Sequence, residues 1–296
     1  MKTLVLQSYR TRAVPRWLKT CHSTVKDWAT GAGYDYRFVG DELFDYIPGW
    51  FKQKCKGQML PITDLGRLQW MERLMREGAA RVVWVDYDVV ILDPSFRVPQ
   101  NLSVLFTKEK WIERAPDGRL VQVDAINNSI MMIERGSPFL QFLIGAILAR
   151  ARRSKTPVDR CFAGTRLLTD LATVFRPPLL RRVAQISPTV LTDLARGSIS
   201  SLNMLAEPEH GGWVAANLCG AFNGRCCAGL QITDQLYESA LRELRIAAVN
   251  FSSIYVRASR GSQSDCRKAG FSPLSGSRCA ERTLSGFSSP RDLTDA

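Results

Sequence analysis

The sequence predicts an α/β fold in which helices flank a mostly parallel sheet. Residues 2–39 show a strand pattern, a helix pattern and a second strand pattern, which is how a βαβ unit opens. Val82–Val85 form an apolar run with no polar break, as expected of a strand buried on both faces inside a parallel sheet. The chain has 296 residues, 45% of them hydrophobic, which is enough for one large domain with its own core.

The first βαβ unit has clear boundaries in the sequence. Residues 2–8 predict the first strand, and Pro15 can begin a helix because the first helical N–H has no partner in the helix. The apolar positions of this helix continue to Trp28, and two glycines follow it. Residues 34–39 alternate and predict the second strand. His22 lies in the helix, where we expect a structural or surface role.

The segment before the buried strand, residues 61–78, also has helical spacing. Its regularly spaced apolar residues are Ile62, Leu65, Leu68, Met71 and Met75. Thr63 can cap the N-terminus of this helix, and Gly78 is a typical residue at a helix C-terminus. Asp64 and Arg67 lie one turn apart, so we expect them to act together at the helix start.

Two carboxylates, Asp86 and Asp88, directly follow the buried strand. In an extended backbone their side chains point the same way, and two close negative charges cost free energy unless a cation lies beside them. The carboxyl end of a strand is also where open α/β sheets bind ligands. These residues therefore predict a divalent metal with oxygen ligands and a polyphosphate in its shell. The alternative is a strand that ends in a solvated turn, because lone D-x-D tripeptides are common.

The segment that contains the helix over residues 61–78, the buried strand and the Asp86-x-Asp88 motif resembles the sugar-binding region of a DXD-motif glycosyltransferase family. That family includes fungal α-1,6-mannosyltransferases and bacterial transferases of capsular polysaccharide and lipid-linked sugars. The residues that match its pattern are Asp64, Arg67, Gly78, Asp86 and Asp88. The usual Gly-Gly of the turn is Gly78-Ala79 here, and the resemblance covers roughly residues 2–170. It implies a GT-A-like, Rossmann-type fold, a nucleoside-diphosphate sugar donor and a manganese or magnesium ion.

The resemblance also implies roles for individual residues. Asp88 would bind the metal directly, and Asp86 would bind it through water or hold donor hydroxyls. Arg67 would add a cation at the donor, and Asp64 would accept hydrogen bonds from sugar hydroxyls. We expect Asp64 and Arg67 to share one cleft with Asp88, within about 10 Å of it. Candidate nucleotide contacts at the end of the first strand are Gln7, Ser8 and Tyr9, although Tyr9 could instead be a packing aromatic.

Later segments supply further candidates. Residues 102–107 and 119–123 look like short strands. Asn127 and Asn128 adjoin an apolar run, where amides usually bind something specific. The family has an asparagine-containing strand here that lines its donor and acceptor cleft, so both are catalytic candidates; the alternative is a turn. Ser137-Pro138 predicts a helix that continues to Arg150.

The segment around Gly164 resembles a family segment in which a glycine turn starts a helix near the donor. Thr165 replaces the usual proline. His210 is a candidate metal ligand, and Trp213 is a candidate contact of the diphosphate, because related enzymes supply a late histidine and tryptophan.

The last third of the chain predicts fewer elements. Residues 185–191 suggest a strand, residues 233–245 an amphipathic helix and residues 247–256 a final strand. We expect one domain over residues 1–256, with a donor-binding half at 1–134 and an acceptor side at 135–256. Residues 257–296 are rich in Ser, Gly and Arg and predict a disordered tail.

Charge and composition limit the partners and the compartment. The net charge is +12, but the chain has no nucleic-acid recognition motif. Two basic clusters, at 150–155 and 176–182, could contact an anionic membrane or form solvated faces. Eight cysteines without metal-ligand spacing, no signal-peptide pattern and no apolar run long enough for a bilayer predict a cytoplasmic protein, with peripheral membrane contact as an option.

The expected function is metal-dependent transfer of a hexose from a nucleoside-diphosphate sugar to a saccharide or lipid-linked acceptor. The resemblance implies retention of configuration and a role in bacterial surface polysaccharide synthesis. One alternative is a non-catalytic nucleotide-sugar-binding protein of the same fold. Another is a metal-dependent phosphohydrolase or nucleotidyltransferase, which would need more histidines or a glycine-rich phosphate loop, and neither is present.

Overall fold

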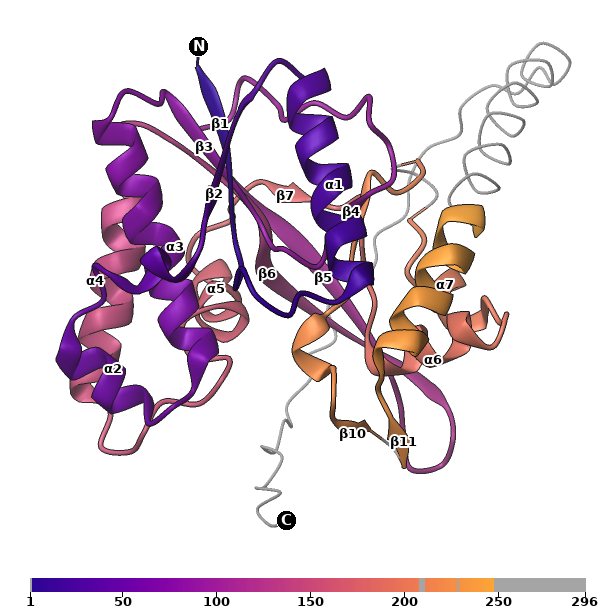
Figure 1. Cartoon of the computed structure of the whole chain (residues 1–296). Coiled ribbons are helices and arrows are strands. Elements are labelled where there is room, and N and C mark those ends of the chain that lie inside the picture. Colours follow the sequence, from indigo (N-terminus) through magenta and orange to yellow (C-terminus); the bar gives the residue numbers. More distant parts are fainter. Residues whose placement is uncertain (1, 208–210, 228, 248–296) are drawn as a thin grey trace, which may run out of the picture. The chain divides into compact units, whose positions relative to one another are not determined.

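A six-stranded sheet forms the centre of the protein in the computed structural model, which describes residues 2–207, 211–227 and 229–247 (Figure 1). Its strands are β1 (Thr3–Ser8), β2 (Asp35–Val39), β3 (Arg81–Val85), β5 (Val104–Arg114), β6 (Leu120–Glu134) and β7 (Leu179–Leu180). The strand order is β2-β1-β3-β6-β5-β7. The pairs β2–β1, β1–β3 and β5–β7 are parallel, and the pairs β3–β6 and β6–β5 are antiparallel. The predicted α/β fold with a mostly parallel sheet is confirmed.

Helices cover both faces of this sheet (Figure 1). They include α1 (Arg16–Gly31), α2 (Gly49–Cys55), α3 (Met59–Arg76), α4 (Pro138–Arg153) and α5 (Thr165–Ala172). Strand β3 shows the two faces directly. Val82 and Trp84 pack in the same hydrophobic cluster as α3 and α4, whereas Val83 and Val85 pack with α1. All residues of β3 are buried, so the prediction of a strand covered on both faces is confirmed.

A smaller sheet brings a distant part of the chain to the end of β3. It consists of β4 (Val89–Ile91), β9 (Ala215–Asn217) and β8 (Val183–Gln185), in the order β4-β9-β8. Strand β9 is antiparallel to β4 and parallel to β8. This sheet packs against α6 (Pro188–Ala195), α7 (Ser200–Asn203) and a helix over residues 234–247. Because β4 begins just after Asp88, its pairing with β9 places residues 217–223 beside the D-x-D turn.

The remaining elements are short. Within residues 2–207, 211–227 and 229–247 they are the 3-10 helices η1 (Asp41–Phe44) and η3 (Gly220–Phe222) and the strands β10 (Cys226–Cys227) and β11 (Leu230–Gln231).

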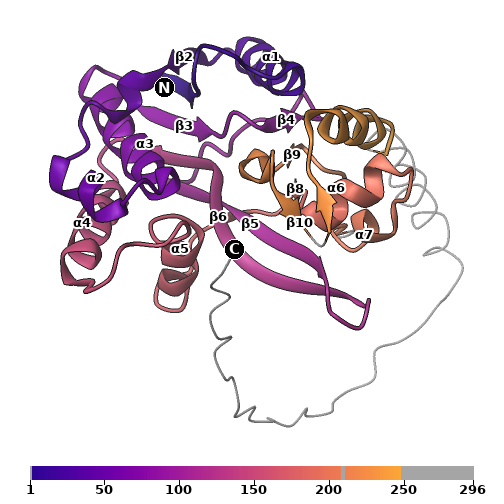
Figure 2. The same ribbon diagram turned by 60° about the horizontal axis from the view of Figure 1, so that its bottom comes forward.

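Strands β5 and β6 form a long hairpin that projects from the body of the domain (Figure 2). The prediction of two short strands at 102–107 and 119–123 was therefore wrong in length. Charged residues such as Lys108 and Lys110 interrupt the apolar pattern, but cross-strand pairing continues through them. Asn127 and Asn128 lie within β6, so the alternative of turn asparagines does not hold.

Helix α3 begins at Met59, earlier than predicted, with Gln58 at its N-cap position. The prediction of Thr63 as a cap was wrong, because Pro61 is tolerated in the first turn and the helix already includes it. Asp64 and Arg67 therefore lie inside the helix rather than at its start. Gly78 follows the helix with a φ of 111°, a conformation that favours glycine, as predicted.

The strand predicted over residues 185–191 was also wrong. Strand β8 ends at Gln185, and Ser187 caps α6 by accepting a hydrogen bond from the Val190 N–H. Pro188 takes the first helical position, and this Ser-Pro start signal outweighed the apolar run. Ala247 belongs to the helix over 234–247 rather than to a strand. The rest of the predicted final strand, the tail at 257–296 and His210 lie outside the described residues.

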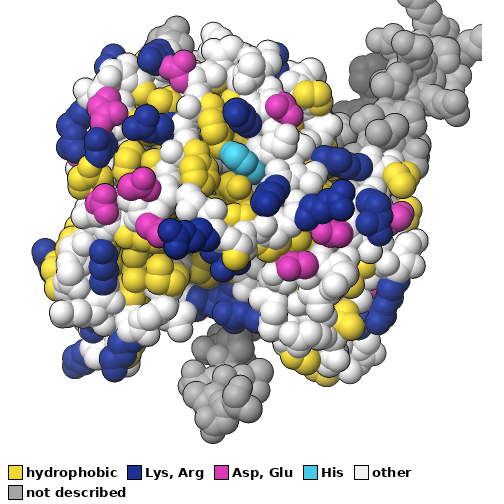
Figure 3. All heavy atoms as spheres, viewed as in Figure 1, with side chains coloured by type: hydrophobic (Ala, Val, Ile, Leu, Met, Phe, Trp, Pro, Cys, Tyr) yellow, Lys and Arg dark blue, Asp and Glu magenta, His cyan; other side chains and the backbone are white. Residues whose placement is uncertain are grey.

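Basic side chains are spread over the surface and mixed with acidic and apolar ones on the face in Figure 3. Several members of the two predicted basic clusters have partners. Arg150 pairs with Asp170 at 3.1 Å, and Arg182 pairs with Asp93 at 3.8 Å. Within the described part of the chain, no helix is both long and apolar enough to span a bilayer.

Candidate active site

The D-x-D segment is a turn and not an extended strand end. Strand β3 stops at Val85, and the Val89 N–H donates to the Asp86 carbonyl at 3.1 Å, which closes the turn. The Asp86 N–H donates to the Ser129 carbonyl of β6 at 2.7 Å. The expectation that Asp86 and Asp88 lie in an extended backbone was therefore wrong. Both carboxylates nevertheless line one cleft.

Arg67 connects helix α3 to this turn through a buried ion cluster. Its Nη2 lies 3.2 Å from Asp64 Oδ1, and its Nη1 lies 3.1 Å from Asp86 Oδ1. Its Nη1 also donates to the Asn128 carbonyl at 3.1 Å, and the guanidinium lies 4.6 Å from the Trp84 ring centroid. The Arg67 side chain is only 4% exposed. Asp64 and Arg67 therefore form a buried ion pair and not an exposed helical salt bridge.

Asp64 is held from several sides. Asn128 Nδ2 donates to Asp64 Oδ1 at 2.9 Å, and burial raises the pKa of Asp64 against the opposing effects of Arg67 and Asn128. Gly164, the N-cap residue of α5, faces the same carboxylate: a Cβ at position 164 would lie 2.8 Å from Asp64 Oδ2. A side chain would displace that carboxylate, so glycine is required here by close approach.

Asp88 has a different environment from Asp86. Its Oδ2 accepts a hydrogen bond from the Gly220 N–H at 2.6 Å. Burial and the neighbouring charge of Asp86 raise the pKa of Asp88 to about 6. Burial also raises the pKa of Asp86, but the Arg67 cation and the Trp84 indole N–H oppose this. No described lysine or arginine forms an ion pair with Asp88, so its charge is the less compensated of the two.

The segment that reaches Asp88 is tightly fixed. Cys219 has a φ of 52°, in the left-handed region, and the next residue, Gly220, directs its N–H at Asp88. The Cys219 carbonyl accepts a hydrogen bond from the Tyr237 hydroxyl at 3.1 Å. Tyr237 in turn stacks on Trp17, with ring centroids 4.1 Å apart. Helix α1 and the helix over residues 234–247 thus position this part of the cleft.

The two carboxylates suit a hard divalent cation. Mn²⁺ and Mg²⁺ prefer oxygen ligands and often keep several non-protein oxygens in their shell. Asp88 and Asp86 line the same cleft, where Asp88 Oδ2 already accepts a hydrogen bond from the Gly220 N–H. Among the described residues, no group of three or more His, Cys, Asp or Glu side chains is arranged to hold a metal. Two carboxylates at one cleft would fit an ion whose remaining ligands are oxygens of a bound diphosphate.

Two connected pockets meet at the D-x-D turn. We call the first, of about 420 Å³, the tyrosine pocket; its lining includes Ser8, Tyr9, Arg10, Trp17 and Tyr87. We call the second, of about 370 Å³, the asparagine pocket; its lining includes Asp64, Glu109, Trp111, Asn127, Asn128, Arg160 and Gly164. Both are lined by Arg67, Asp86 and Asp88. Each volume lies in the range of small-molecule sites.

Aromatic rings line the tyrosine pocket. Tyr9 stacks on Tyr87 with ring centroids 4.7 Å apart, and the Arg10 guanidinium lies 5.6 Å from the Tyr9 centroid. Behind them His22 stacks on Tyr87 and bonds the Tyr36 hydroxyl at 2.7 Å, so its predicted structural role fits. Gln7 is fully buried and lines neither pocket. Its side-chain amide donates a hydrogen bond to the Asp86 carbonyl at 3.3 Å and so stabilises the D-x-D turn.

Trp213 lies outside both pockets. Its side chain is 7% exposed and packs in the hydrophobic cluster of the smaller sheet. Conversely, sequence analysis did not find Trp17, Glu109, Trp111, Gly220 or Phe222, which do line the cleft. No local pattern marks these residues, because their position depends on the hairpin and on the β4–β9 pairing.

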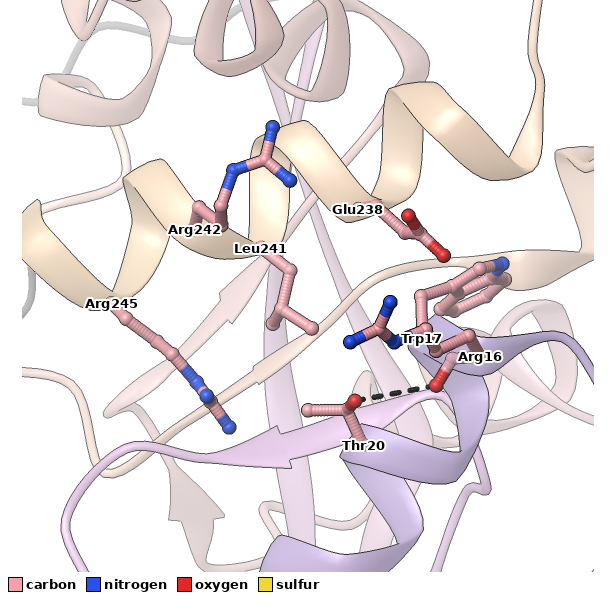
Figure 4. Close-up of a pocket in the computed structure, with 7 residues that line it drawn as sticks. All are labelled: Arg16, Trp17, Thr20, Glu238, Leu241, Arg242 and Arg245. Atoms are coloured by element: carbon pink, nitrogen blue, oxygen red, sulfur yellow. Dashed lines mark hydrogen bonds between the residues drawn. The ribbon is translucent and has the colours of Figure 1, made fainter.

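A third pocket, of about 210 Å³, lies between the start of α1 and the helix over residues 234–247 (Figure 4). Three arginines line it: Arg16, Arg242 and Arg245. It contains none of the predicted site residues and shares only Trp17 with the tyrosine pocket. The cleft at the D-x-D turn is therefore the candidate active site.

No family model and no curated protein matches the chain. Among solved structures, it is similar to a glycosyltransferase involved in glycosylation of the major capsid of PBCV-1, at 8% identity and a TM-score of 0.44, over 81% of this chain and 98% of that one. It is also similar to mouse xyloside xylosyltransferase 1, at 9% identity and a TM-score of 0.40, over 73% and 97% of the two chains.

A further similar structure is the glycosyltransferase GlyE of Streptococcus pneumoniae, at 11% identity and a TM-score of 0.41. That alignment covers 89% of this chain and 64% of GlyE. These likenesses are too distant to assign a function, which we argue from the residues of the cleft.

Proposed function

We propose that this protein is a metal-dependent glycosyltransferase that moves a hexose from a nucleoside-diphosphate sugar to a saccharide or lipid-linked acceptor. The observation that supports this best is the position of Asp88 and Asp86 at the junction of two unlike pockets. An aromatic pocket suits a nucleobase, a polar pocket suits a sugar, and the junction between them suits a diphosphate.

Different residues of the chain would then bind the base, the sugar and the diphosphate of the donor. Tyr9 offers a ring face for the base, and Asp64 and Asn128 offer acceptors and donors for sugar hydroxyls in the asparagine pocket. A Mn²⁺ or Mg²⁺ ion held by Asp88, with Asp86 bound directly or through water, would neutralise charge on the leaving diphosphate. Arg67 lies beneath this junction and holds the Asp64 and Asp86 carboxylates in place.

Transfer with retention of configuration is part of the proposal, as the sequence resemblance implies. In that reaction the acceptor hydroxyl forms the new bond to the anomeric carbon, the bond to the diphosphate breaks, and the leaving phosphate oxygen takes the hydroxyl proton. This chemistry needs no dedicated protein base. The same resemblance favours a role in bacterial surface polysaccharide synthesis.

Nucleotide release from a panel of UDP- and GDP-hexoses, with manganese, tests the proposal. Asp88→Asn should reduce release at least about 100-fold, equivalent to about 2.7 kcal/mol, because it removes a charge at the diphosphate with little change in volume. Asp45→Asn is the matched control, since Asp45 is an exposed aspartate away from the cleft. Full turnover in excess chelator would contradict the metal role.

The same assay separates the alternatives. A non-catalytic binding protein would bind the nucleotide sugar and release nothing. A phosphohydrolase would cleave the bond between the two phosphates and release nucleoside monophosphate and sugar 1-phosphate. A nucleotidyltransferase would pass the nucleoside monophosphate to an acceptor and release sugar 1-phosphate. Only a glycosyltransferase releases the nucleoside diphosphate and passes the sugar to an acceptor or to water.

Peripheral contact with an anionic membrane also remains part of the proposal. Phe142 on α4 is 41% exposed and packs against Phe175, which is 39% exposed. Arg152 and Arg153 are exposed at the end of the same helix. Sedimentation with phosphatidylglycerol vesicles, compared with phosphatidylcholine vesicles, tests this contact. Charge reversal at Arg152 and Arg153 should abolish it, and reversal at the exposed Arg37 of β2 should not.

A further inference from the structure

Two aromatic side chains that line the asparagine pocket have no role in the donor binding proposed above. Trp111 and Phe222 have ring centroids 5.8 Å apart, and both line this pocket but not the tyrosine pocket. The Arg160 guanidinium lies 5.0 Å from the Phe222 centroid. Both rings are only partly buried. Partly exposed rings in a polar cleft offer apolar faces, against which the C–H face of a sugar ring can pack.

A carboxylate accompanies these rings. Glu109 lies on β5 two residues before Trp111, so both side chains project from the same face of the hairpin. Asn127 Nδ2 donates to Glu109 Oε2 at 2.7 Å. The Asn127 amide cannot turn freely, because its Oδ1 accepts hydrogen bonds from the Ser129 N–H at 3.1 Å and the Ser129 hydroxyl at 2.9 Å. Glu109 is therefore held in one orientation.

This carboxylate has spare capacity for a hydrogen bond. Glu109 Oε1 accepts no hydrogen bond from the described residues, and none of their lysines or arginines forms an ion pair with Glu109. Burial raises the pKa of Glu109, and the bond from Asn127 opposes this only in part. Asp64 and Asp86 differ, since Arg67 pairs with both. Glu109 is half-buried in the asparagine pocket, and its carboxylate can accept a hydrogen bond from a sugar hydroxyl there.

We infer that Glu109, Trp111 and Phe222 form the acceptor subsite, which binds a saccharide. The two rings contact the apolar face of the acceptor sugar, and Glu109 Oε1 accepts a hydrogen bond from one of its hydroxyls. The three residues line the same pocket as Asp88, and none of them lines the tyrosine pocket assigned to the base. This inference rests on the proposed function, because it assigns the second substrate of the same reaction.

Binding to an array of immobilised mono- and oligosaccharides, with manganese and either UDP or GDP present, tests the subsite. The full chain should bind a subset of the saccharides. Trp111→Ala and Glu109→Gln should each weaken that binding about tenfold or more, and Trp111→Phe should retain most of it. Glu109→Gln preserves shape and an acceptor oxygen for Asn127, so it should fold normally.

Two matched controls should leave saccharide binding unchanged. Trp50→Ala removes a partly buried tryptophan of α2 that also lies beneath an arginine, with Arg152 at 4.9 Å from its ring centroid. Glu113→Gln removes an exposed glutamate of the same strand as Glu109.

The kinetic readout distinguishes this subsite from a donor site. With a saccharide from the array as acceptor, Glu109→Gln should raise the acceptor KM about tenfold or more and should change the donor KM much less. An equal rise in the donor KM would place Glu109 at the donor and overturn the inference, as would a full chain that hydrolyses donor but binds no saccharide. Saccharide binding without any donor turnover would instead refute the proposed function and leave the subsite standing.

Discussion

Gly164 lies directly against the carboxylate of Asp64, although the two residues are 100 positions apart in the chain. A Cβ at position 164 would lie 2.8 Å from Asp64 Oδ2 and 3.3 Å from its Cγ. Asp64 cannot move away without breaking its contacts with Arg67 and Asn128. The start of α5 and the middle of α3 therefore fit together only if residue 164 has no side chain.

Gly164→Ala should consequently disturb the ion cluster. We expect a loss of about 1–3 kcal/mol in the free energy of unfolding, as for an overpacked core position, together with weaker donor binding. Urea denaturation and donor titration measure the two effects.

Gly145→Ala is the control for this substitution. Gly145 lies within α4, and a Cβ there would meet nothing within 4 Å. Alanine in a helix interior should stabilise the protein by about 0.5–1 kcal/mol. Equal effects of the two substitutions would show that position 164 tolerates a methyl group.

Arg67 should contribute more to stability than an exposed helical ion pair. Its removal leaves the buried Asp64 and the half-buried Asp86 without their cation, so Arg67→Met should cost about 3–5 kcal/mol in the free energy of unfolding. An exposed pair one turn long would contribute about 0.3–0.5 kcal/mol. A loss in that smaller range, measured by urea denaturation, would contradict the buried cluster.

The double variant Asp64→Asn/Arg67→Met provides a further check. If the cost of Arg67→Met arises from an uncompensated charge, neutralising Asp64 should recover part of it. Exposed Arg76, which pairs with Glu72 at 3.3 Å on the same helix, supplies the control: Arg76→Met should change stability little.

Tyr9 should bind the nucleobase by stacking. Tyr9→Ala should weaken the binding of UDP or GDP, whichever is preferred, by about 1–3 kcal/mol, the usual range for base–aromatic stacking. Tyr9→Phe should bind normally, because it keeps the ring. Calorimetric titration provides the measurement, with Tyr46→Ala, at an exposed tyrosine outside both pockets, as the control. Unchanged affinity in Tyr9→Ala would mean that Tyr9 only packs against Tyr87.

Glu207 should make stability depend on pH. Burial alone would raise the pKa of Glu207, but hydrogen bonds from Lys108 and Lys110, at 2.5 and 3.0 Å, outweigh it and lower the pKa. A carboxylate with a lowered pKa in the folded state stabilises the protein above its unfolded pKa of 4.5, and this stabilisation is lost as the pH falls through the folded value. Glu207 therefore strengthens the β5–β6 hairpin at neutral pH.

Glu207→Gln should lower the free energy of unfolding at pH 7 by about 1.5–3 kcal/mol, the range for hydrogen bonds to charged groups. The difference between this variant and the original chain should shrink as the pH falls below 4.5. Thermal unfolding between pH 3 and pH 7 measures this. A difference that stays constant with pH would show that the interaction does not depend on the carboxylate charge.

Local patterns were enough to predict the first βαβ unit, the buried strand and the helix that begins after Ser137. The boundaries of α1, β3 and α4 follow from apolar spacing, a proline at the helix start and a glycine at the exit. The pairing of Asp64 and Arg67 also followed from spacing, because residues three apart on a helix are neighbours. These features depend on a few adjacent residues and are therefore visible in the sequence.

Other features were decided by contacts between distant segments. The two short strands predicted at 102–107 and 119–123 became one long hairpin, because strand pairing and not local composition sets strand length. Glu109 enters the cleft only through that hairpin, and Gly220 reaches Asp88 only because β9 pairs with β4.

The sequence by itself thus determined the α/β class and the candidate residues Asp64, Arg67, Asp86 and Asp88, since each belongs to a short and regular pattern. Only the tertiary structure decided that these four share a cleft, that Gln7 and Trp213 lie outside its lining, and that Glu109 and Trp111 lie inside it. The physical reason is that a pocket forms where elements from separate parts of the chain pack together. The burial and charge of each lining side chain depend on that packing.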